Sequence, residues 1–217
     1  MGRLIVIEGL DGAGKRTLAD ELVTALRAEG ASVRTLAFPR YGKSVHADLI
    51  HEALHREHGD LAESVYGMGL LYALDRRDAA EDIRADLRAY DVVLLDRYVA
   101  SNAAYQAARL YQGADGGVVE WVRELEIVRF GLPVPAAQLL LRVPASLAGA
   151  RAQQRAETET DRAKDLFESD DDLQTRCAKV YDQLAARSWL SHWYTIDGAA
   201  SVDTRKLATD LLLVHET

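Results

Sequence analysis

A glycine-rich segment at residues 9–17, with the sequence GLDGAGKRT, is the feature that most constrains the fold. The apolar run before it, residues 4–7, has the length of a buried strand, and the apolar positions after Thr17 fall at helical intervals up to Gly30. In such a strand–loop–helix unit, glycines let backbone N–H groups surround a phosphate, and the helix N-terminus adds positive potential. The segment therefore predicts a polyphosphate-binding loop, which we favour over a glycine-rich turn without a ligand.

Within this loop, Lys15 is expected to bridge the β- and γ-phosphates of a nucleoside triphosphate. Arg16 stands where the motif has a serine or threonine that binds Mg²⁺. Three alternatives follow: Thr17 takes that role, the cation depends more on carboxylates, or Arg16 itself contacts a phosphate. The loop residues expected to contact the triphosphate are Gly9, Leu10, Asp11, Gly12, Ala13, Gly14, Lys15, Arg16 and Thr17.

Short apolar runs alternate with helical patterns along the chain. The predicted strands are residues 4–7, 32–37, 92–95, 137–143 and 193–196. The predicted helices are residues 17–30, 46–55, 61–89, 103–111, 118–130, 146–155, 171–186 and 204–214. This alternation is typical of a parallel sheet covered on both faces, in which ligands bind beyond the carboxyl ends of the strands. We therefore predict an α/β protein with a five-stranded parallel sheet and one domain spanning residues 1–217.

The formal net charge of −8 argues against a general nucleic-acid-binding protein, which needs a basic surface. No apolar run reaches about 18 residues, the length of a membrane-spanning helix. Cys177 is the only cysteine, which excludes an internal disulfide, and a cytoplasmic location is expected. Because Cys177 lies in a helical pattern, we interpret it as a packed residue rather than a nucleophile.

Residues suited to phosphate chemistry also follow the second and third predicted strands. Asp96 ends the third strand, where its carboxylate could hold Mg²⁺ directly or through water, although an acid at a strand end is often only a cap. The segment 38–42, FPRYG, follows the second strand. Because the carboxyl ends of neighbouring parallel strands lie at one edge of the sheet, these residues are predicted to meet the loop at 9–17.

Residues 94–106, LLDRYVASNAAYQ, resemble the signature of thymidylate kinases over its whole length. The FPRYG segment and Asp11 within the loop match the same family, and the similarity runs from Leu4 to about Asp197. Among its members the chain looks closest to the actinobacterial ones. The resemblance implies the P-loop nucleoside-monophosphate kinase fold and transfer of a phosphoryl group from ATP to dTMP, giving ADP and dTDP for dTTP synthesis. It also implies Mg²⁺ as cofactor and a homodimer.

The resemblance also implies roles for residues on the acceptor side. Arg40 and Arg97 match residues that bind the 5′-phosphate of dTMP, and Tyr72 and Arg76 match residues that stack on and hydrogen-bond thymine. Spacing agrees, since residues 72 and 76 share one helical face; the alternative for Arg76 is a surface arginine paired with Asp75 or Glu81. The full expected set is Asp11, Phe38, Arg40, Tyr41, Tyr72, Arg76, Arg97, Ser101, Asn102, Tyr105, Asp165, Phe167 and Glu168.

Within that set, Asn102 corresponds to a second base contact, and Tyr105 to the residue that packs against the sugar and disfavours a ribose hydroxyl. Asp11 would accept a hydrogen bond from the 3′-hydroxyl. Phe167 departs from the tyrosine of close relatives: the ring is kept and one hydroxyl is lost.

Residues 149–168 look like the lid of this kinase class, although a charged run of this kind could equally be a solvated helix. The family divides by whether an extra catalytic arginine lies in the phosphate loop or in the lid. Because the loop has Gly12 at that position, the resemblance assigns the role to Arg155, with Arg151 on the ATP phosphates or adenine. The expected catalytic residues are Asp11, Lys15, Asp96, Arg97 and Arg155, and the expected metal ligands are Asp11, Asp96 and Glu168.

Two other functions remain as alternatives: another pyrimidine nucleotide or deoxynucleoside kinase on the same scaffold, and a P-loop ATPase that acts as a switch. The triad His51, His55 and His58 has a spacing that allows a metal site on a helix face, but a solvated amphipathic helix is favoured.

Overall fold

The computed structural model describes residues 2–158, 166–167 and 169–214. Its described residues form a five-stranded sheet in the order β2-β3-β1-β4-β5, with every neighbouring pair parallel. The strands are β1 (Arg3–Glu8), β2 (Val33–Ala37), β3 (Val92–Asp96), β4 (Ala137–Arg142) and β5 (His192–Asp197). The predicted fold class is confirmed, and each predicted strand ends within one residue of the observed one. β1, β3 and β4 are buried almost throughout, as expected for strands covered on both faces.

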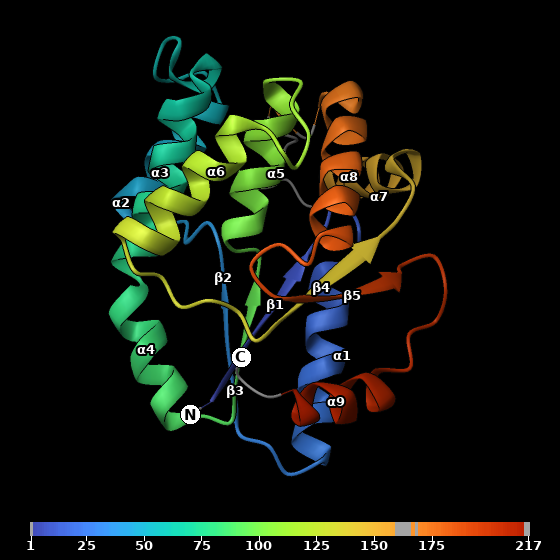
Figure 1. Ribbon diagram of the computed structural model, residues 1–217. Coiled ribbons are helices and arrows are strands. Elements are labelled where there is room, and N and C mark those ends of the chain that lie inside the picture. Colours follow the sequence, from blue (N-terminus) through green and yellow to red (C-terminus); the bar gives the residue numbers. More distant parts are fainter. Residues whose placement is uncertain (1, 159–165, 168, 215–217) are drawn as a thin grey trace.

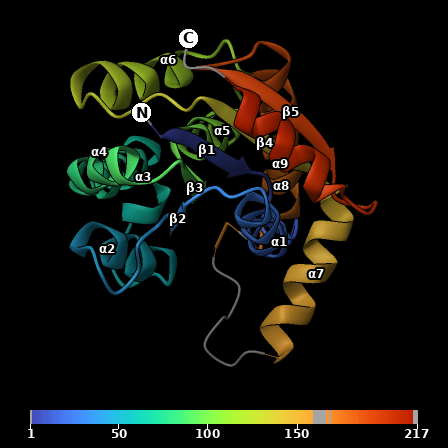
Figure 2. The ribbon, with the colours of Figure 1, turned by 90° about the horizontal axis from the view of Figure 1, so that it is seen from below.

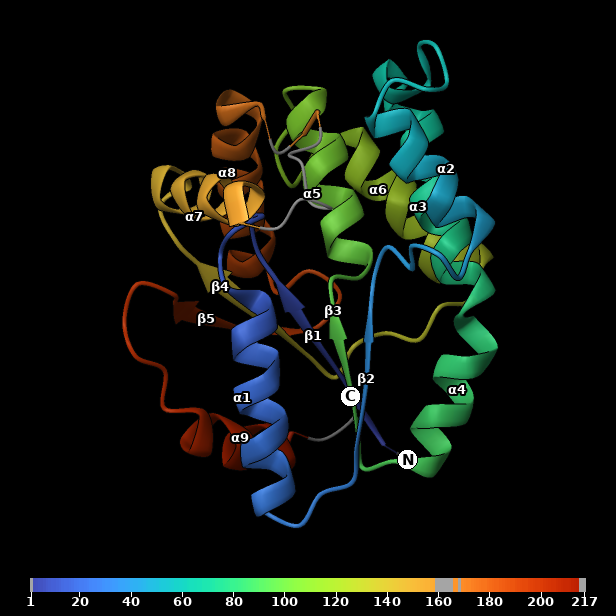
Figure 3. The same cartoon turned by 180° about the vertical axis from the view of Figure 1, so that it is seen from behind.

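The helices are α1 (Lys15–Ala28), α2 (Val45–Leu54), α3 (Val65–Asp78), α4 (Ala80–Ala89), α5 (Val99–Arg109), α6 (Gly117–Arg123), α7 (Ala145–Thr158), α8 (Asp171–Ala186) and α9 (Thr204–Leu213). α1 packs against α9, and α5 packs against α8 (Figures 1 and 3). The arrowheads of β1, β3 and β4 point toward the half of the molecule that holds α5, α7 and α8 (Figure 1). Ligand-competent residues at those strand ends therefore face the same region as these helices.

The prediction of one long helix over residues 61–89 is wrong. The segment consists of a 3-10 turn, η1 (Leu61–Glu63), followed by α3 and α4. Ser64 caps α3, because its hydroxyl accepts a hydrogen bond from the N–H of Gly67. α3 ends at Ala79, whose backbone N–H bonds to the carbonyls of Arg76 and Arg77. The apolar spacing continues across Ala79 into Ile83 and Leu87, so periodicity alone does not reveal the break.

A second helix is also less regular than predicted. The pattern at residues 118–130 forms α6 followed by a π-helix, η2 (Glu124–Arg129). A π-helix has one more residue per hydrogen-bonded turn than an α-helix, which changes the direction in which its side chains point. In η2 the result is that Glu126 is completely buried.

The predicted lid lies partly outside the described residues. α7 extends three residues beyond the predicted end at Arg155, packs against α8 and runs away from the sheet (Figure 2). Asp165 and Glu168 lie outside the described residues, and for Arg155 only the backbone is described. Among the described residues, no helix has the length and apolar character needed to cross a membrane. Cys177 is completely buried in α8, which confirms that it is a packed residue.

Candidate active site

The glycine-rich loop adopts a conformation that requires its glycines. Gly9, Gly12 and Gly14 have φ angles of 144°, 77° and 98°, in the region that side chains disfavour. A Cβ at Gly12 would also lie 2.1 Å from the carbonyl oxygen of Ala148 in α7. Gly14 caps α1 in the left-handed conformation, so the helix begins directly at Lys15. The loop thus has the geometry of a turn that presents backbone N–H groups at a helix N-terminus.

The lysine of this loop is buried, and its ammonium group donates to the carbonyl oxygen of Leu10 at 2.9 Å. Burial lowers the pKa of Lys15, and the positive charge of Arg97 lowers it further. An anion beside Lys15 would offset both effects by stabilising the charged ammonium group, as a bound phosphate would. Arg16 and Thr17 follow on the first turn of α1, and both are exposed.

Asp11 is joined to Arg97 and Tyr105. Its Oδ1 accepts from Nη2 of Arg97 at 2.5 Å, and its Oδ2 accepts from the hydroxyl of Tyr105 at 2.7 Å. Burial raises the pKa of Asp11, but the charges of Arg97 and Lys15 outweigh this and hold the pKa well below its ordinary value. Asp11 is therefore a carboxylate at neutral pH. The structure brings these predicted site residues, from the loop after β1, the turn after β3 and α5, into one cluster.

Arg97 itself has an uncommon backbone conformation, with a φ angle of 66°. Its Nη1 donates to the hydroxyl of Ser101 at 3.1 Å and to that of Tyr181 at 3.4 Å. The guanidinium also lies 5.3 Å from the centre of the Tyr105 ring. These contacts fix the direction of the planar guanidinium, which favours bidentate binding of a phosphate or carboxylate group.

Below this arginine lies Glu8, a completely buried carboxyl at the end of β1. It accepts hydrogen bonds from the backbone N–H groups of Tyr98 and Ser101 and from the hydroxyls of Ser101 and Tyr181. Since the same two hydroxyls accept from Arg97, Glu8 holds the groups that orient the arginine.

We predict that Glu8 makes stability depend on pH. Burial raises its pKa above the ordinary 4.5, although its hydrogen bonds and Arg97 oppose the shift. Because the folded protein holds this proton more tightly than the unfolded chain, the contribution of Glu8 to stability falls as pH rises from 4.5 through the raised pKa. Urea unfolding of wild type and Glu8→Gln at several pH values tests this. The variant should gain relative stability as pH rises, and a constant difference would contradict the prediction.

Arg40, the other arginine expected on the acceptor phosphate, is held by Asp75 of α3. Its Nε donates to Oδ1 of Asp75 at 2.8 Å, and its backbone N–H donates to Oδ2 at 3.0 Å. Asp75 is only 1% exposed, so the pair is shielded from solvent. The Arg40 guanidinium lies 5.9 Å from the ring centre of Phe38, whereas Tyr41 is exposed.

Arg76 is not the surface arginine paired with Asp75 or Glu81 that was the alternative to a base contact. Arg76 is buried, and it donates through Nε and Nη2 to the two carboxylate oxygens of Glu126 at 2.5 and 2.8 Å. Asn102 donates to the same carboxylate at 2.8 Å and to the carbonyl oxygen of Gly69 at 2.9 Å. The two residues expected to contact a pyrimidine are thus joined through a third, from η2.

Asp96 is the described residue best placed for a cation. Its Oδ1 is buried and has no hydrogen-bond partner among the described residues. An unpaired buried carboxylate oxygen at the end of β3 fits a magnesium ion or its bound water. The other expected ligands differ: Asp11 is paired with Arg97, and Glu168 lies outside the described residues. No group of three or more histidine, cysteine or acidic residues in the described part of the chain could hold a metal by itself.

The triad of histidines does not form such a site. His51 and His55 stack with ring centres 4.2 Å apart, and His58 pairs with Glu52 at 2.6 Å. All three lie at or near the exposed C-terminal end of α2. The favoured alternative, a solvated helix face, agrees with this arrangement.

Arg151 of α7 reaches the loop. Its Nη1 lies 3.4 Å from the carbonyl oxygens of Ala13 and Gly198. Its position beside the loop agrees with the expected role on the donor phosphates. Three residues earlier in α7, the backbone of Ala148 lies against the loop at Gly12.

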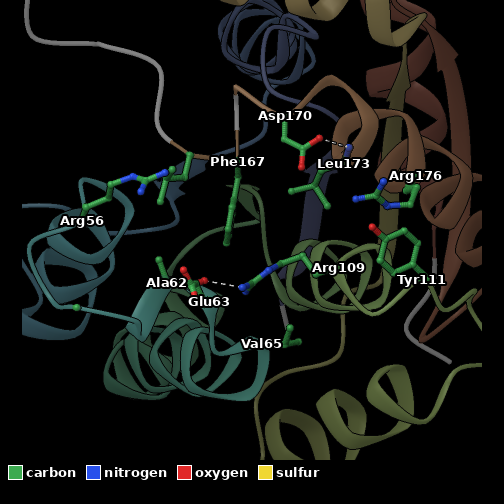
Figure 4. Close-up of a pocket in the computed structure, with 12 residues that line it drawn as sticks. Arg56, Ala62, Glu63, Val65, Arg109, Tyr111, Phe167, Asp170, Leu173 and Arg176 are labelled. Atoms are coloured by element: carbon green, nitrogen blue, oxygen red, sulfur yellow. Dashed lines mark hydrogen bonds between the residues drawn. The ribbon is translucent and has the colours of Figure 1, made fainter.

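A cavity of about 410 Å³ lies between η1, the end of α5 and the start of α8. Figure 4 shows Arg109 extending across it toward η1, where Nη2 donates to the carbonyl oxygen of Ala62 at 2.5 Å. The guanidinium lies 4.6 Å from the ring centre of Phe167, and that ring lies 6.3 Å from Tyr105. Phe167 is the predicted site residue that lines the cavity, and its ring lies near both Arg109 and Tyr105. Tyr72 is half-buried against the core and lies near Arg109.

Four residues that organise this region were missed by sequence reasoning: Glu8, Asp75, Glu126 and Tyr181. Glu8 carried a readable signal, because an acid inside an apolar strand run requires a partner. Asp75 lies next to Arg76 in the sequence, but its partner is Arg40, 35 residues away. Glu126 and Tyr181 contact residues 50 and 80 or more positions away, and no local pattern marks them.

A parallel sheet, a glycine-rich loop at a helix N-terminus and a buried loop lysine define the class of P-loop kinases. Residues 7–206 match a family model described as thymidylate kinase, and the chain belongs to this family. It is 55% identical over 208 residues to the thymidylate kinase of Mycobacterium tuberculosis, covering 96% of each chain. It is 34% identical to that of Rhodopseudomonas palustris, covering 86% of this chain and 77% of the relative. For the enzyme of Bifidobacterium longum the identity is 30%, with 93% and 92% covered.

Proposed function

We propose that this protein transfers the γ-phosphoryl group of ATP to dTMP, giving ADP and dTDP for dTTP synthesis. The observation that carries the proposal is the cluster of Lys15, Asp11 and Arg97, in which a buried loop lysine lies beside an oriented arginine. A site that binds two nucleotides end to end needs positive charge on both sides of the transferred group. Membership of the thymidylate kinase family specifies the acceptor.

In this proposal, catalysis consists of positioning and charge neutralisation. The loop N–H groups and Lys15 bind the donor phosphates, and Arg40 and Arg97 bind the 5′-phosphate of dTMP. Asp75 and Glu8 keep those two arginines in place. Arg155 supplies the additional catalytic charge from the lid, which we assign to residues 149–168, and Arg151 binds the donor.

On the acceptor side, Tyr72, Arg76 and Asn102 bind the base, and Tyr105 packs against the sugar. Asp11 accepts from the 3′-hydroxyl. The proposed sugar and phosphate contacts also include Phe38, Tyr41, Ser101, Asp165, Phe167 and Glu168.

We assign the magnesium to Asp96, with Asp11 and Glu168 as further ligands. The unpaired oxygen of Asp96 supports this assignment. A bound Mg²⁺ neutralises charge on the donor phosphates during transfer.

The proposal is tested by coupled ADP release with ATP and a panel of acceptors: dTMP, dUMP, dCMP and thymidine. We expect the highest kcat/KM for dTMP. Because Arg40 and Arg97 are assigned to a phosphate, thymidine should be a poor acceptor. Preference for thymidine would contradict this assignment, and acceptor-independent ADP release would favour the ATPase alternative.

We also propose that the protein is a cytoplasmic homodimer. Tyr66 and Leu70 lie one turn apart on α3 and are 50% and 41% exposed, which is unusual for large apolar side chains on the same helix face. These side chains are exposed in the single chain, and we propose that a second copy of the chain covers them in the dimer. Light scattering of the purified protein is expected to give twice the chain mass of 23.9 kDa.

A further inference from the structure

We propose that Glu126 determines the base specificity of the acceptor site. It does so by fixing the side-chain amide of Asn102 so that its oxygen, and not its NH₂ group, is available to the base. This inference rests on the proposed function, because it takes the site of Arg76 and Asn102 to be the one that binds the pyrimidine.

The amide of Asn102 has one orientation in this structure. Its Nδ2 donates to the carboxylate of Glu126 at 2.8 Å and to the carbonyl oxygen of Gly69 at 2.9 Å. Both partners only accept hydrogen bonds, so the oxygen of the amide cannot take the place of its nitrogen. Both N–H bonds of Asn102 are thereby used within the protein.

The other side of the amide is fixed in the same direction. Oδ1 of Asn102 accepts from Nε2 of Gln106 at 3.2 Å, and Oε1 of Gln106 accepts from Nη1 of Arg109 at 3.0 Å. A guanidinium only donates, so Arg109 sets the orientation of Gln106, which in turn agrees with that of Asn102. Gln106 and Glu126 are completely buried and Asn102 is 2% exposed, so water does not compete for these bonds.

Glu126 also limits what Arg76 can offer. Nε and Nη2 of Arg76 donate to the carboxylate, while Nη1 makes no hydrogen bond among the described residues. The pair of residues therefore offers N–H donors from Arg76 and one acceptor lone pair from Asn102.

This combination matches one pyrimidine edge and opposes the other. Thymine and uracil have an acceptor at O4 and a donor at N3–H, which complement Arg76 and Asn102. Cytosine has a donor at its 4-amino group and an acceptor at N3, so both contacts would be repulsive. Glu126 thus acts as a positioning residue: it need not touch the base, yet it sets the donor and acceptor pattern that the base meets.

The test compares kcat/KM for dTMP and dCMP in wild type and two variants. In Glu126→Gln the new side chain has only one acceptor oxygen and an NH₂ group that can face Asn102 in its place. Only Gly69 and Gln106 then still favour the observed orientation of the Asn102 amide. In Glu126→Asp the charge beside Arg76 stays, but the shorter side chain withdraws an oxygen from Asn102. We expect the ratio of dTMP to dCMP efficiency to fall at least about tenfold in each, with KM for ATP unchanged.

A matched control is Asp75→Asn. Asp75 is the neighbour of Arg76 on α3 and is equally buried, but its carboxylate holds Arg40, which is assigned to the phosphate that both acceptors share. It should weaken dTMP and dCMP by the same factor and leave their ratio unchanged. Folded Glu126 variants, verified by circular dichroism, that keep the wild-type ratio would overturn the inference.

A measurement on the wild type decides the case in which both Glu126 variants fail to fold. The N3-methyl derivative of dTMP lacks the N3–H donor, and we expect its kcat/KM to be at least about tenfold below that of dTMP. Equal turnover would overturn the inference while leaving dTMP kinase activity intact. Absence of wild-type activity on dTMP, by contrast, would refute the proposed function itself.

Discussion

Replacing Lys15 with alanine is expected to lower kcat on the order of a thousandfold, the range found when one preorganised charge is removed from a transition state. The ammonium group of Lys15 is buried beside Arg97, and in the described part of the chain it donates to the carbonyl oxygen of Leu10. Its charge is thus held at a cost that an arriving polyphosphate relieves. A coupled ADP-release assay at saturating ATP and dTMP measures the loss.

Lys206→Ala is the control for this substitution. Lys206 is an exposed lysine on the first turn of α9. Its substitution removes the same charge from a residue far from the loop in the sequence. Its kcat should equal that of the wild type. Removal of the buried charge should leave the fold intact, which thermal unfolding checks. Full activity in a folded Lys15→Ala protein would refute the assignment of the loop to the donor phosphates.

The second large effect is expected for Arg97→Ala, which should reduce kcat/KM for dTMP by about a hundredfold or more. The guanidinium contacts Asp11, Ser101 and Tyr181, and its removal leaves the carboxylate of Asp11 without its cation. Arg97→Lys should recover little, because a single ammonium group cannot reproduce the planar fork that those partners hold.

The appropriate control is Arg142→Ala. Arg142 ends β4 and pairs with Asp182 at the surface, so an exposed ion pair is lost in place of a buried one. The kinetic parameters should stay at wild-type values. If Arg97→Ala raised the KM of ATP and left that of dTMP unchanged, the arginine would belong to the donor side and the proposed arrangement would be wrong.

The strands were predictable from sequence because a buried parallel strand requires an uninterrupted apolar run, and residues 4–7 and 92–95 have no other explanation. The helix boundaries were harder to predict. Apolar spacing shows which face of a helix is buried, and the same spacing continues from α3 into α4 across Ala79. Ser64 was a readable signal for a new helix start, because its hydroxyl caps α3.

The site was predictable where family motifs carry the residue, as in the cluster of Asp11, Arg97 and Tyr105. The site was not predictable where two buried charged residues that are far apart in the sequence form an ion pair. Arg76 had two nearby acids in sequence, yet it pairs with Glu126 because a π-helix turns that carboxylate into the core. Such a pairing depends on tertiary packing, and the spacing of apolar residues in the sequence does not reveal it.

The contact of Gly12 with α7 bears on how this enzyme family can diverge. A side chain at this position would collide with the carbonyl oxygen of Ala148, and the φ angle of 77° disfavours one independently. An arginine in the loop and a helix α7 seated in this place are therefore mutually exclusive. Under the proposed assignment of the extra arginine to Arg155 in the lid, a single substitution at Gly12 cannot move it to the loop while α7 keeps this position. Helix α7 would have to move first. A change from one arrangement to the other therefore requires more than one substitution.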